Sequence, residues 1–171
     1  MEAVSSAFNA VVSGNEAFKA ISDVKIAGVK DVKDGGVHVV IITVPYKQIK
    51  AVRALSATLI PELEKKLDGA QAVIVGQHRA FPKTPEHGRR YKAIRNYGRT
   101  LRSVNDALLE DMVYPTAIVG KRVHYNLDGK QTTKVILDKH DATRVEERLT
   151  SFAAAYNRLT GLKTVFEVAE N

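Results

Sequence analysis

The residues with the clearest chemical potential are cations gathered in one stretch of the chain. The sequence holds 26 lysines and arginines against 19 aspartates and glutamates, a formal net charge of +7. Residues 78–102 carry all of this excess, because they hold eight bases and one acid, Glu86, while the rest of the chain is balanced. A neutral body with one cationic segment is typical of a dedicated contact with a polyanion. The eight bases are Arg79, Lys83, Arg89, Arg90, Lys92, Arg95, Arg99 and Arg102.

Two aromatic side chains, Tyr91 and Tyr97, stand among these cations. Arginine and lysine neutralise phosphates, arginine can bind two acceptors at once, and tyrosine rings stack on unpaired bases. The combination favours a contact with RNA over the alternative, a solvated basic loop without a partner. Two further cationic pairs, Lys65–Lys66 and Lys121–Arg122, lie outside the stretch. Both interpretations stay open for these pairs, either as contacts or as solubilising surface residues.

Patterns for catalysis or metal binding are weak by comparison. The histidines do not show the helical H-x₃-H spacing of a metal site, and the absence of cysteine excludes disulfides, thiol nucleophiles and Cys-ligated metals. Gly120–Lys121 lacks the earlier glycine that a phosphate-binding loop requires. His140–Asp141 could form half of an acid–base relay, but Asp141 is better explained as a cap of the last helix. The histidines are His38, His78, His87, His124 and His140. We therefore expect no enzyme, no catalytic residue, no metal, no cofactor and no small-molecule substrate.

Length and composition limit the class of protein. A chain of 171 residues fits a single domain over residues 1–171, since domains average roughly 150 residues. Its 44% hydrophobic and 26% charged residues are near the averages of globular proteins. No apolar run approaches the roughly 18 residues of a membrane span, and no leader pattern opens the chain. We expect an intracellular soluble protein without membrane contact.

The hydrophobic spacing predicts the elements that lead into the basic stretch. Apolar residues three and four apart predict a first helix, which Gly14–Asn15 ends or interrupts. The turn Asp34–Gly35–Gly36 joins two strands, the second apolar on both faces and therefore expected in the middle of a covered sheet. A helix through Ile49 and Leu67 follows, with a kink or a new helix start at Pro61. The predicted strands cover residues 23–32, 37–44 and 70–78.

Residues 79–99 show no apolar periodicity, and a loop of this length in a compact domain is usually functional. Thr100 caps the next helix, on which Arg102, Asp106 and Glu110 predict a surface ion-pair ladder. A hairpin turn at Asp128–Gly129 and a long amphipathic helix complete the chain, with a final strand at residues 163–168. These elements are strands 117–126 and 130–138 and a helix 141–160, with a possible capping box at Thr143 and Glu146 and Gly161 as its end. The order α-β-β-α-β-(basic loop)-α-β-β-α-β predicts an α+β fold, with mixed or antiparallel sheet elements and packed helices.

Several strings of this chain resemble the eukaryotic-type small-subunit ribosomal protein seven family. The resemblance runs from about residue 37 to residue 168 and depends most on its long central string, which holds LEDMVYP and IVGKR. The matching strings are PELEKKLDG at 61–69, VIVGQHRAFPKTP at 73–85, RTLRSVNDALLEDMVYPTAIVGKRVHYNLDG at 99–129, KVILDK at 134–139, and YNRLTG with VFE at 156–161 and 165–167.

This resemblance implies a structural protein of the small ribosomal subunit without enzymatic activity. Its implied partners are small-subunit rRNA, neighbouring small-subunit ribosomal proteins and, transiently, assembly factors. It also implies a part in pre-rRNA processing and subunit assembly, a place in the cytosolic ribosome and a nucleolar assembly stage. The family's RNA-binding loop maps onto Arg79 to Arg102, and the GKR of its hairpin maps onto Gly120, Lys121 and Arg122. The alternatives are a non-ribosomal RNA-binding assembly or chaperone factor and, less favoured, an RNA-acting enzyme that uses a histidine–acid pair.

Overall fold

A computed structural model describes residues 2–14, 18, 21, 24–80 and 100–169. Six strands and a set of helices follow one another in the predicted order, and the fold is α+β. The first half holds α1 (Glu2–Gly14), β1 (Gly28–Asp34), β2 (Val37–Val44), α2 (Ile49–Ala54), α3 (Ser56–Lys66) and β3 (Gln71–Gly76). The second half holds α4 (Leu101–Val113), β4 (Ile118–Tyr125), β5 (Gln131–Leu137), η2 (Lys139–Asp141), α5 (Ala142–Val145), η3 (Glu146–Arg148), α6 (Leu149–Thr160) and β6 (Lys163–Val168).

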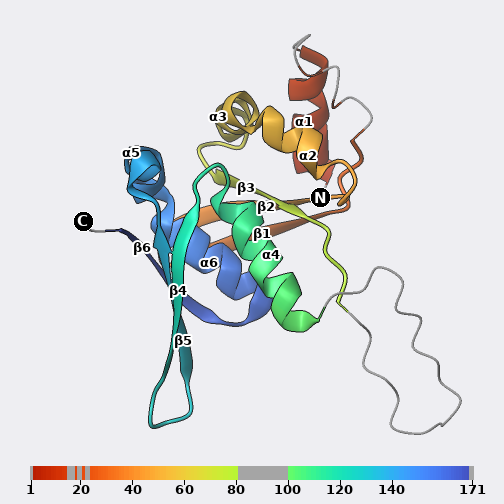
Figure 1. Cartoon of the computed structure of the whole chain (residues 1–171). Helices are drawn as coiled ribbons and strands as arrows, with labels where there is room; N and C mark the ends of the chain where they lie inside the picture. Colours follow the sequence, from red (N-terminus) through yellow and green to blue (C-terminus); the bar gives the residue numbers. More distant parts are fainter. Residues whose placement is uncertain (1, 15–17, 19–20, 22–23, 81–99, 170–171) are drawn as a thin grey trace, which may run out of the picture.

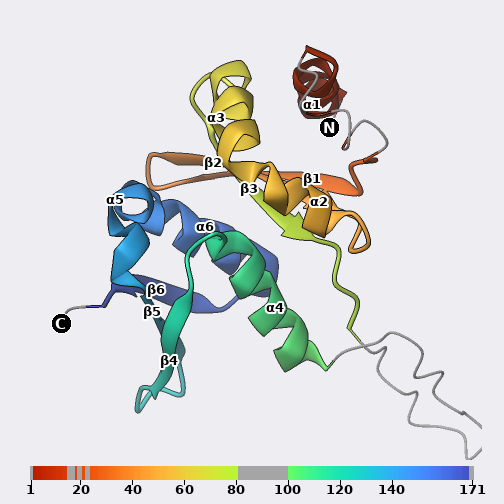
Figure 2. The same ribbon diagram turned by 45° about the horizontal axis from the view of Figure 1, so that its top comes forward.

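The elements stack as alternating layers of helices and sheets (Figures 1 and 2). Helices α1, α2 and α3 lie on one face of the sheet β1–β2–β3, and α4 and α6 lie on its other face. The second sheet, β4–β5–β6, covers the far side of α4 and α6. Two apolar cores result, one under α1 and α3 and one that joins both sheets to α4 and α6.

The two halves repeat one topology. In each half an antiparallel hairpin is followed by helices and then by a strand that pairs in parallel with the second hairpin strand. The sequence holds no internal repeat that would reveal this relation. Residues 81–99 therefore belong to the connection between two structurally similar halves.

Strand β2 confirms the prediction of a strand buried on both faces. Val39 and Ile41 enter the core with α4 and α6, whereas Val40 and Ile42 enter the core with α1 and α3. Successive side chains of a strand point to opposite faces, so a continuous apolar run is required where both faces are covered. The turn before it is also confirmed, since Gly35 and Gly36 have φ of 55° and 87°.

The sequence predicted a kink or a new helix start at Pro61, and no helix starts there. The helix is interrupted at Leu55, six residues earlier, and Pro61 lies inside α3. Ser56 is buried, and its hydroxyl donates to the Arg53 carbonyl over 2.7 Å, which satisfies a carbonyl at the end of α2. The exposed position of Pro61 lets its ring point away from the core, so packing outweighs the local cost of proline.

The prediction of one continuous helix over residues 141–160 was also wrong. The segment is divided into η2, α5, η3 and α6, and Thr143 lies inside α5 rather than at a helix start. The Asp138 carboxylate accepts a hydrogen bond from the His140 backbone N–H at 3.3 Å, while the side chain of Asp141 lies outside the described part. The apolar face nevertheless holds, because Val145, Phe152 and Tyr156 are buried in one core with Leu149 and Leu159 against it. Gly161 ends α6 with φ of 74°, as predicted.

Candidate functional site

Four of the predicted RNA-binding residues lie in the described part of the chain. Arg79 and Arg102 flank the 81–99 segment and are exposed, and Lys121 and Arg122 lie on β4 and are exposed. The other eight fall at residues 81–99, outside the described residues, and their role stays a prediction. They are Lys83, Arg89, Arg90, Tyr91, Lys92, Arg95, Tyr97 and Arg99.

Both ends of the 81–99 segment are firmly placed. Strand β3 and helix α4 pack against each other, and Figure 1 shows the exit of β3 and the start of α4 on the same side of the molecule. The Thr100 hydroxyl accepts a hydrogen bond from the Ser103 N–H at 3.3 Å and caps α4, as predicted. The fold thus brings Arg79 and Arg102 to one side of the protein, where they are the described ends of the basic stretch.

A buried cluster around Asp111 fixes the exit of β3. One Asp111 carboxylate oxygen accepts hydrogen bonds from the Gly76 backbone N–H and from His78 Nε2, each at 2.7 Å. The other oxygen forms an ion pair with Arg53. The side chains of His78 and Asp111 are 4% and 5% exposed. Because a carboxylate is an acceptor, the contact places a proton on Nε2 of the imidazole ring.

This cluster joins three elements, α2 through Arg53, β3 through Gly76 and α4 through Asp111. A Cβ at position 76 would lie 2.8 Å from both an Asp111 carboxylate oxygen and the Cδ1 of Ile49, so any larger residue would displace these side chains. The Tyr46 ring meets the His78 ring edge-on at 5.5 Å between centroids, and the Arg53 guanidinium lies 5.2 Å from the Tyr114 ring centroid. The arrangement is a structural anchor for the strand that leads into the basic stretch. Sequence reasoning missed it, although an aspartate one residue before the apolar Met112 was a signal.

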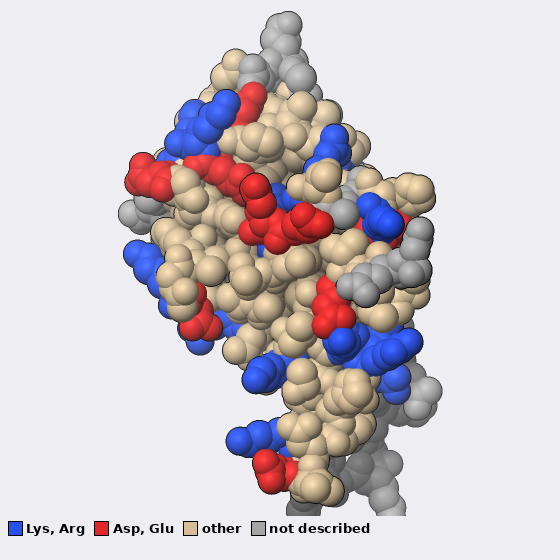
Figure 3. Space-filling view, turned by 90° about the vertical axis from the view of Figure 1, so that its left-hand side faces the viewer, with Lys and Arg blue, Asp and Glu red and all other residues tan. Residues whose placement is uncertain are grey.

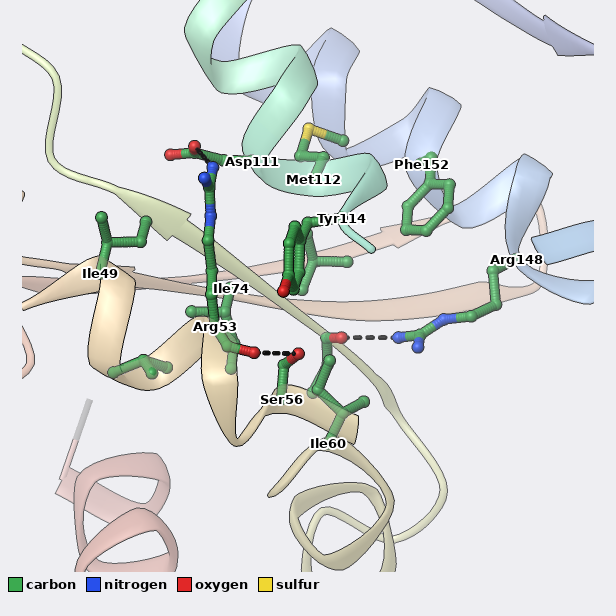
Figure 4. Close-up of a pocket in the computed structure, with 13 residues that line it drawn as sticks. Ile49, Arg53, Ser56, Ile60, Ile74, Asp111, Met112, Tyr114, Arg148 and Phe152 are labelled. Carbon is green, nitrogen blue, oxygen red and sulfur yellow. Dashed lines mark hydrogen bonds and ion pairs between the residues drawn. The ribbon is translucent and has the colours of Figure 1, made fainter. Parts of the chain in front are cut away.

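A second ion pair, between Arg148 and Glu64, lies against the other end of edge strand β3. Arg148 Nη2 lies 2.9 Å from Glu64 Oε1 and donates to the Ala72 carbonyl at 2.6 Å, and the Ala72 N–H donates to the same Glu64 oxygen at 3.0 Å. A pocket lies along this edge, and Figure 4 shows Arg53 and Arg148 on opposite sides of it. The pocket holds about 30 Å³, room for a water molecule or two rather than for a nucleotide. The outward N–H and C=O of Ala72 on this edge strand are thereby occupied and cannot pair with another chain.

The two adjacent cations of β4, Lys121 and Arg122, point to opposite faces of their sheet. Lys121 pairs in register with the buried Val135 and forms an ion pair with Asp106 of α4. Arg122 pairs with Lys134 and lies on the opposite, open face. The predicted ladder on α4 was therefore wrong at Asp106, whose described partner is Lys121 rather than Arg102.

Burial, followed by the charge of Asp106, raises the pKa of Tyr156 above 10.0.

Within residues 2–80 and 100–169, as far as they are described, no group of three histidine or acidic side chains is placed to hold a metal ion. None of the described helices has the length and apolar character needed to cross a membrane.

Comparison with known proteins gives one consistent result. The family model described as Ribosomal protein S7e matches residues 1–168. The chain is 38% identical over 167 residues to the small ribosomal subunit protein eS7 of Caenorhabditis elegans, which covers 96% of this chain and 86% of that protein. It is 40% identical over 153 residues to the same protein of Anopheles gambiae (88% and 79% covered) and 44% identical over 133 residues to that of Manduca sexta (77% and 70% covered).

Proposed function

Since the chain belongs to the ribosomal protein S7e family, we propose that it binds small-subunit rRNA and takes part in pre-rRNA processing and subunit assembly. Membership makes it a structural constituent of the small ribosomal subunit and not an enzyme. Its partners are then rRNA and neighbouring ribosomal proteins, in the cytosolic ribosome. Transient assembly factors and a nucleolar assembly stage complete the proposal.

The concentration of charge carries this proposal. The stretch from Arg79 to Arg102 holds the entire net charge of +7, and its described ends lie on one side of the fold. A polyanion such as rRNA is attracted over several ångströms to such a localised charge, while the balanced remainder of the chain contributes no net attraction. The anchors around Asp111 and Thr100 support the proposal because they hold both ends of the stretch in place.

The test is the salt dependence of RNA binding after four arginines of the stretch are changed together. Changing Arg89, Arg90, Arg95 and Arg99 to glutamine should flatten the slope of log affinity against log salt by roughly 3 to 4, at about 0.9 per phosphate contact on a duplex. The slope is measured by fluorescence anisotropy with a labelled RNA duplex, at salt concentrations from about 50 to 300 mM KCl.

The matched control removes four charges elsewhere. Lys30, Lys33, Lys47 and Lys50 are exposed residues of the first half, and changing them to glutamine should flatten the slope much less. Equal flattening by both variants would show that charge acts as a diffuse field, and the localised contact would be refuted.

Co-sedimentation separates this proposal from its alternative. A constituent of the subunit stays with salt-washed small subunits, whereas a non-ribosomal assembly or chaperone factor is released by the wash. The enzyme alternative has no support in the family, and the described His78–Asp111 pair is buried beside a structural ion pair rather than in an open pocket.

A further inference from the structure

The second sheet presents one face that no described element covers. Helices α4 and α6 lie on one side of β4–β5–β6, and the other side is open in Figures 1 and 2. The covered side holds the buried Val135, Leu137 and Phe166. Side chains alternate along each strand, so the residues next to these three on β5 and β6, and their partners in register, point to the open side. We refer to this side as the open face.

The open face carries four basic side chains at neighbouring positions. The register places Arg122 opposite Lys134, and it places His124 opposite Thr132, which in turn lies opposite Lys163. Arg122, His124 and Lys163 are exposed, and the Lys134 side chain is 40% exposed. Strands lie about 4.8 Å apart and alternate residues about 6.6 Å, so all four Cα atoms fall within roughly 12 Å of one another. Figure 3 views this face, and several blue side chains lie over its lower part, with red ones beside them.

The pairing itself indicates an anionic partner. Like charges directly opposite each other on two strands destabilise a sheet, and Arg122 faces Lys134 in this way. Glu167 balances one of the two charges, since its Oε2 lies 2.7 Å from Lys134 Nζ. In the described part of the chain, neither Arg122 nor Lys163 forms an ion pair. By contrast, Lys121 on the covered face has Asp106 as its partner.

We infer that the open face is a second RNA-contact surface, separate from the 79–102 stretch, in which Arg122 and Lys163 bind phosphates and Lys134 contributes beside Glu167. This inference rests on the proposed rRNA binding and assigns it a second surface. The exposed Val165, at 40%, lies between the cations, where a ribose could pack. Thr132 and Gly120 are small or polar neighbours that let a backbone approach the sheet.

The experiment removes two unpaired charges from this face. The double variant Arg122→Gln and Lys163→Gln should flatten the salt slope for a labelled RNA duplex by about 1.4 to 1.8, at 0.7 to 0.9 per contact. If the binding extrapolated to 1 M salt is unchanged, this corresponds to roughly 25- to 60-fold weaker affinity at 0.1 M. Thermal melting of the variant should match that of the unmodified chain, because both side chains are exposed.

Lys30→Gln with Lys33→Gln is the matched control, since both are exposed lysines on strand β1 of the other sheet. The open-face inference predicts a clearly smaller change of slope in this control. It also predicts that the Arg122 and Lys163 changes flatten the slope further when they are added to the four-arginine variant of the stretch.

The outcomes separate the two proposals. If the four-arginine variant flattens the slope and the open-face variant does not, the open-face inference is overturned and the proposed function stands. If the unmodified chain shows no salt-dependent RNA binding, the proposed function falls. If the open-face variant is lost from salt-washed subunits while its RNA slope is unchanged, the face binds an acidic protein and the inference is again overturned.

Discussion

Replacing Asp111 by alanine should destabilise the protein strongly. The substitution removes the acceptor for the Gly76 N–H, for His78 and for Arg53 at once. Two of these donors are buried, and each buried donor without a partner costs about 1–3 kcal/mol. Removing one partner of a buried ion pair costs about 3–5 kcal/mol in measured cases, which agrees with that count. The loss is a large part of the total stability of a small domain, about 5–15 kcal/mol.

The assay is urea unfolding followed by circular dichroism, because the chain has no tryptophan to report by fluorescence. The free energy of unfolding should fall by about 3–5 kcal/mol while the dependence on urea stays the same. Asp106→Ala is the matched control, since Asp106 lies on the same helix and pairs with Lys121, but its side chain is 42% exposed. An exposed ion pair contributes about 0–1 kcal/mol, and the gain in helix propensity is similar for both variants.

A difference of less than about 1 kcal/mol between the two variants would refute this reasoning, given the expected gap between buried and exposed pairs. It would mean that the three donors find other acceptors once the carboxylate is gone. Asp111→Asn tests the same point more gently, because it keeps one acceptor oxygen and the side-chain volume. Its unfolding free energy should lie between those of the unmodified chain and Asp111→Ala.

Three further expectations follow from the core. Gly76→Ala should cost about 1–3 kcal/mol by urea unfolding, because its Cβ would lie 2.8 Å from an Asp111 oxygen; an unchanged midpoint would contradict this. Phe152→Ala should cost about 3–5 kcal/mol, since the ring is 5% exposed, and RNA affinity at a temperature where the variant is folded should be unchanged. The pKa of Tyr156 is raised by burial and then by Asp106, so its contribution to stability is present below about pH 10 and is lost as pH rises through the higher pKa of the folded state. Tyr156→Phe should therefore unfold with a weaker pH dependence above about pH 10 than the unmodified chain, and identical alkaline profiles would show that Tyr156 is not the group involved.

The sequence was sufficient for local structure. The glycine turns at 35–36 and 129, the doubly buried strand β2 and the Thr100 cap follow from rules that act within a few residues, and the structure confirms all of them. The helix breaks at Leu55 and within residues 139–148 were not predictable in the same way. In both places the helical spacing of apolar residues continues in the sequence, and packing against the neighbouring layers decides where the helix is interrupted.

The chain by itself also determined the charge that carries the proposed function, because charge is a property of composition and position. All of the +7 lies in residues 78–102, whatever the fold. Family membership likewise depends on the sequence, through a match that spans residues 1–168.

Only the tertiary structure decided which charged side chains form ion pairs within the protein and which face solvent. Arg53 and Asp111 are 58 residues apart, and Gly76 and Asp111 are 35 apart, so no local pattern reveals their contact. Lys121 and Arg122 are adjacent and have the same charge, yet the pleat of β4 sends one to Asp106 and the other to the open face. The physical reason is that hydrophobic spacing fixes the elements, whereas the partners of each polar group are fixed by strand register and by which faces the layers cover.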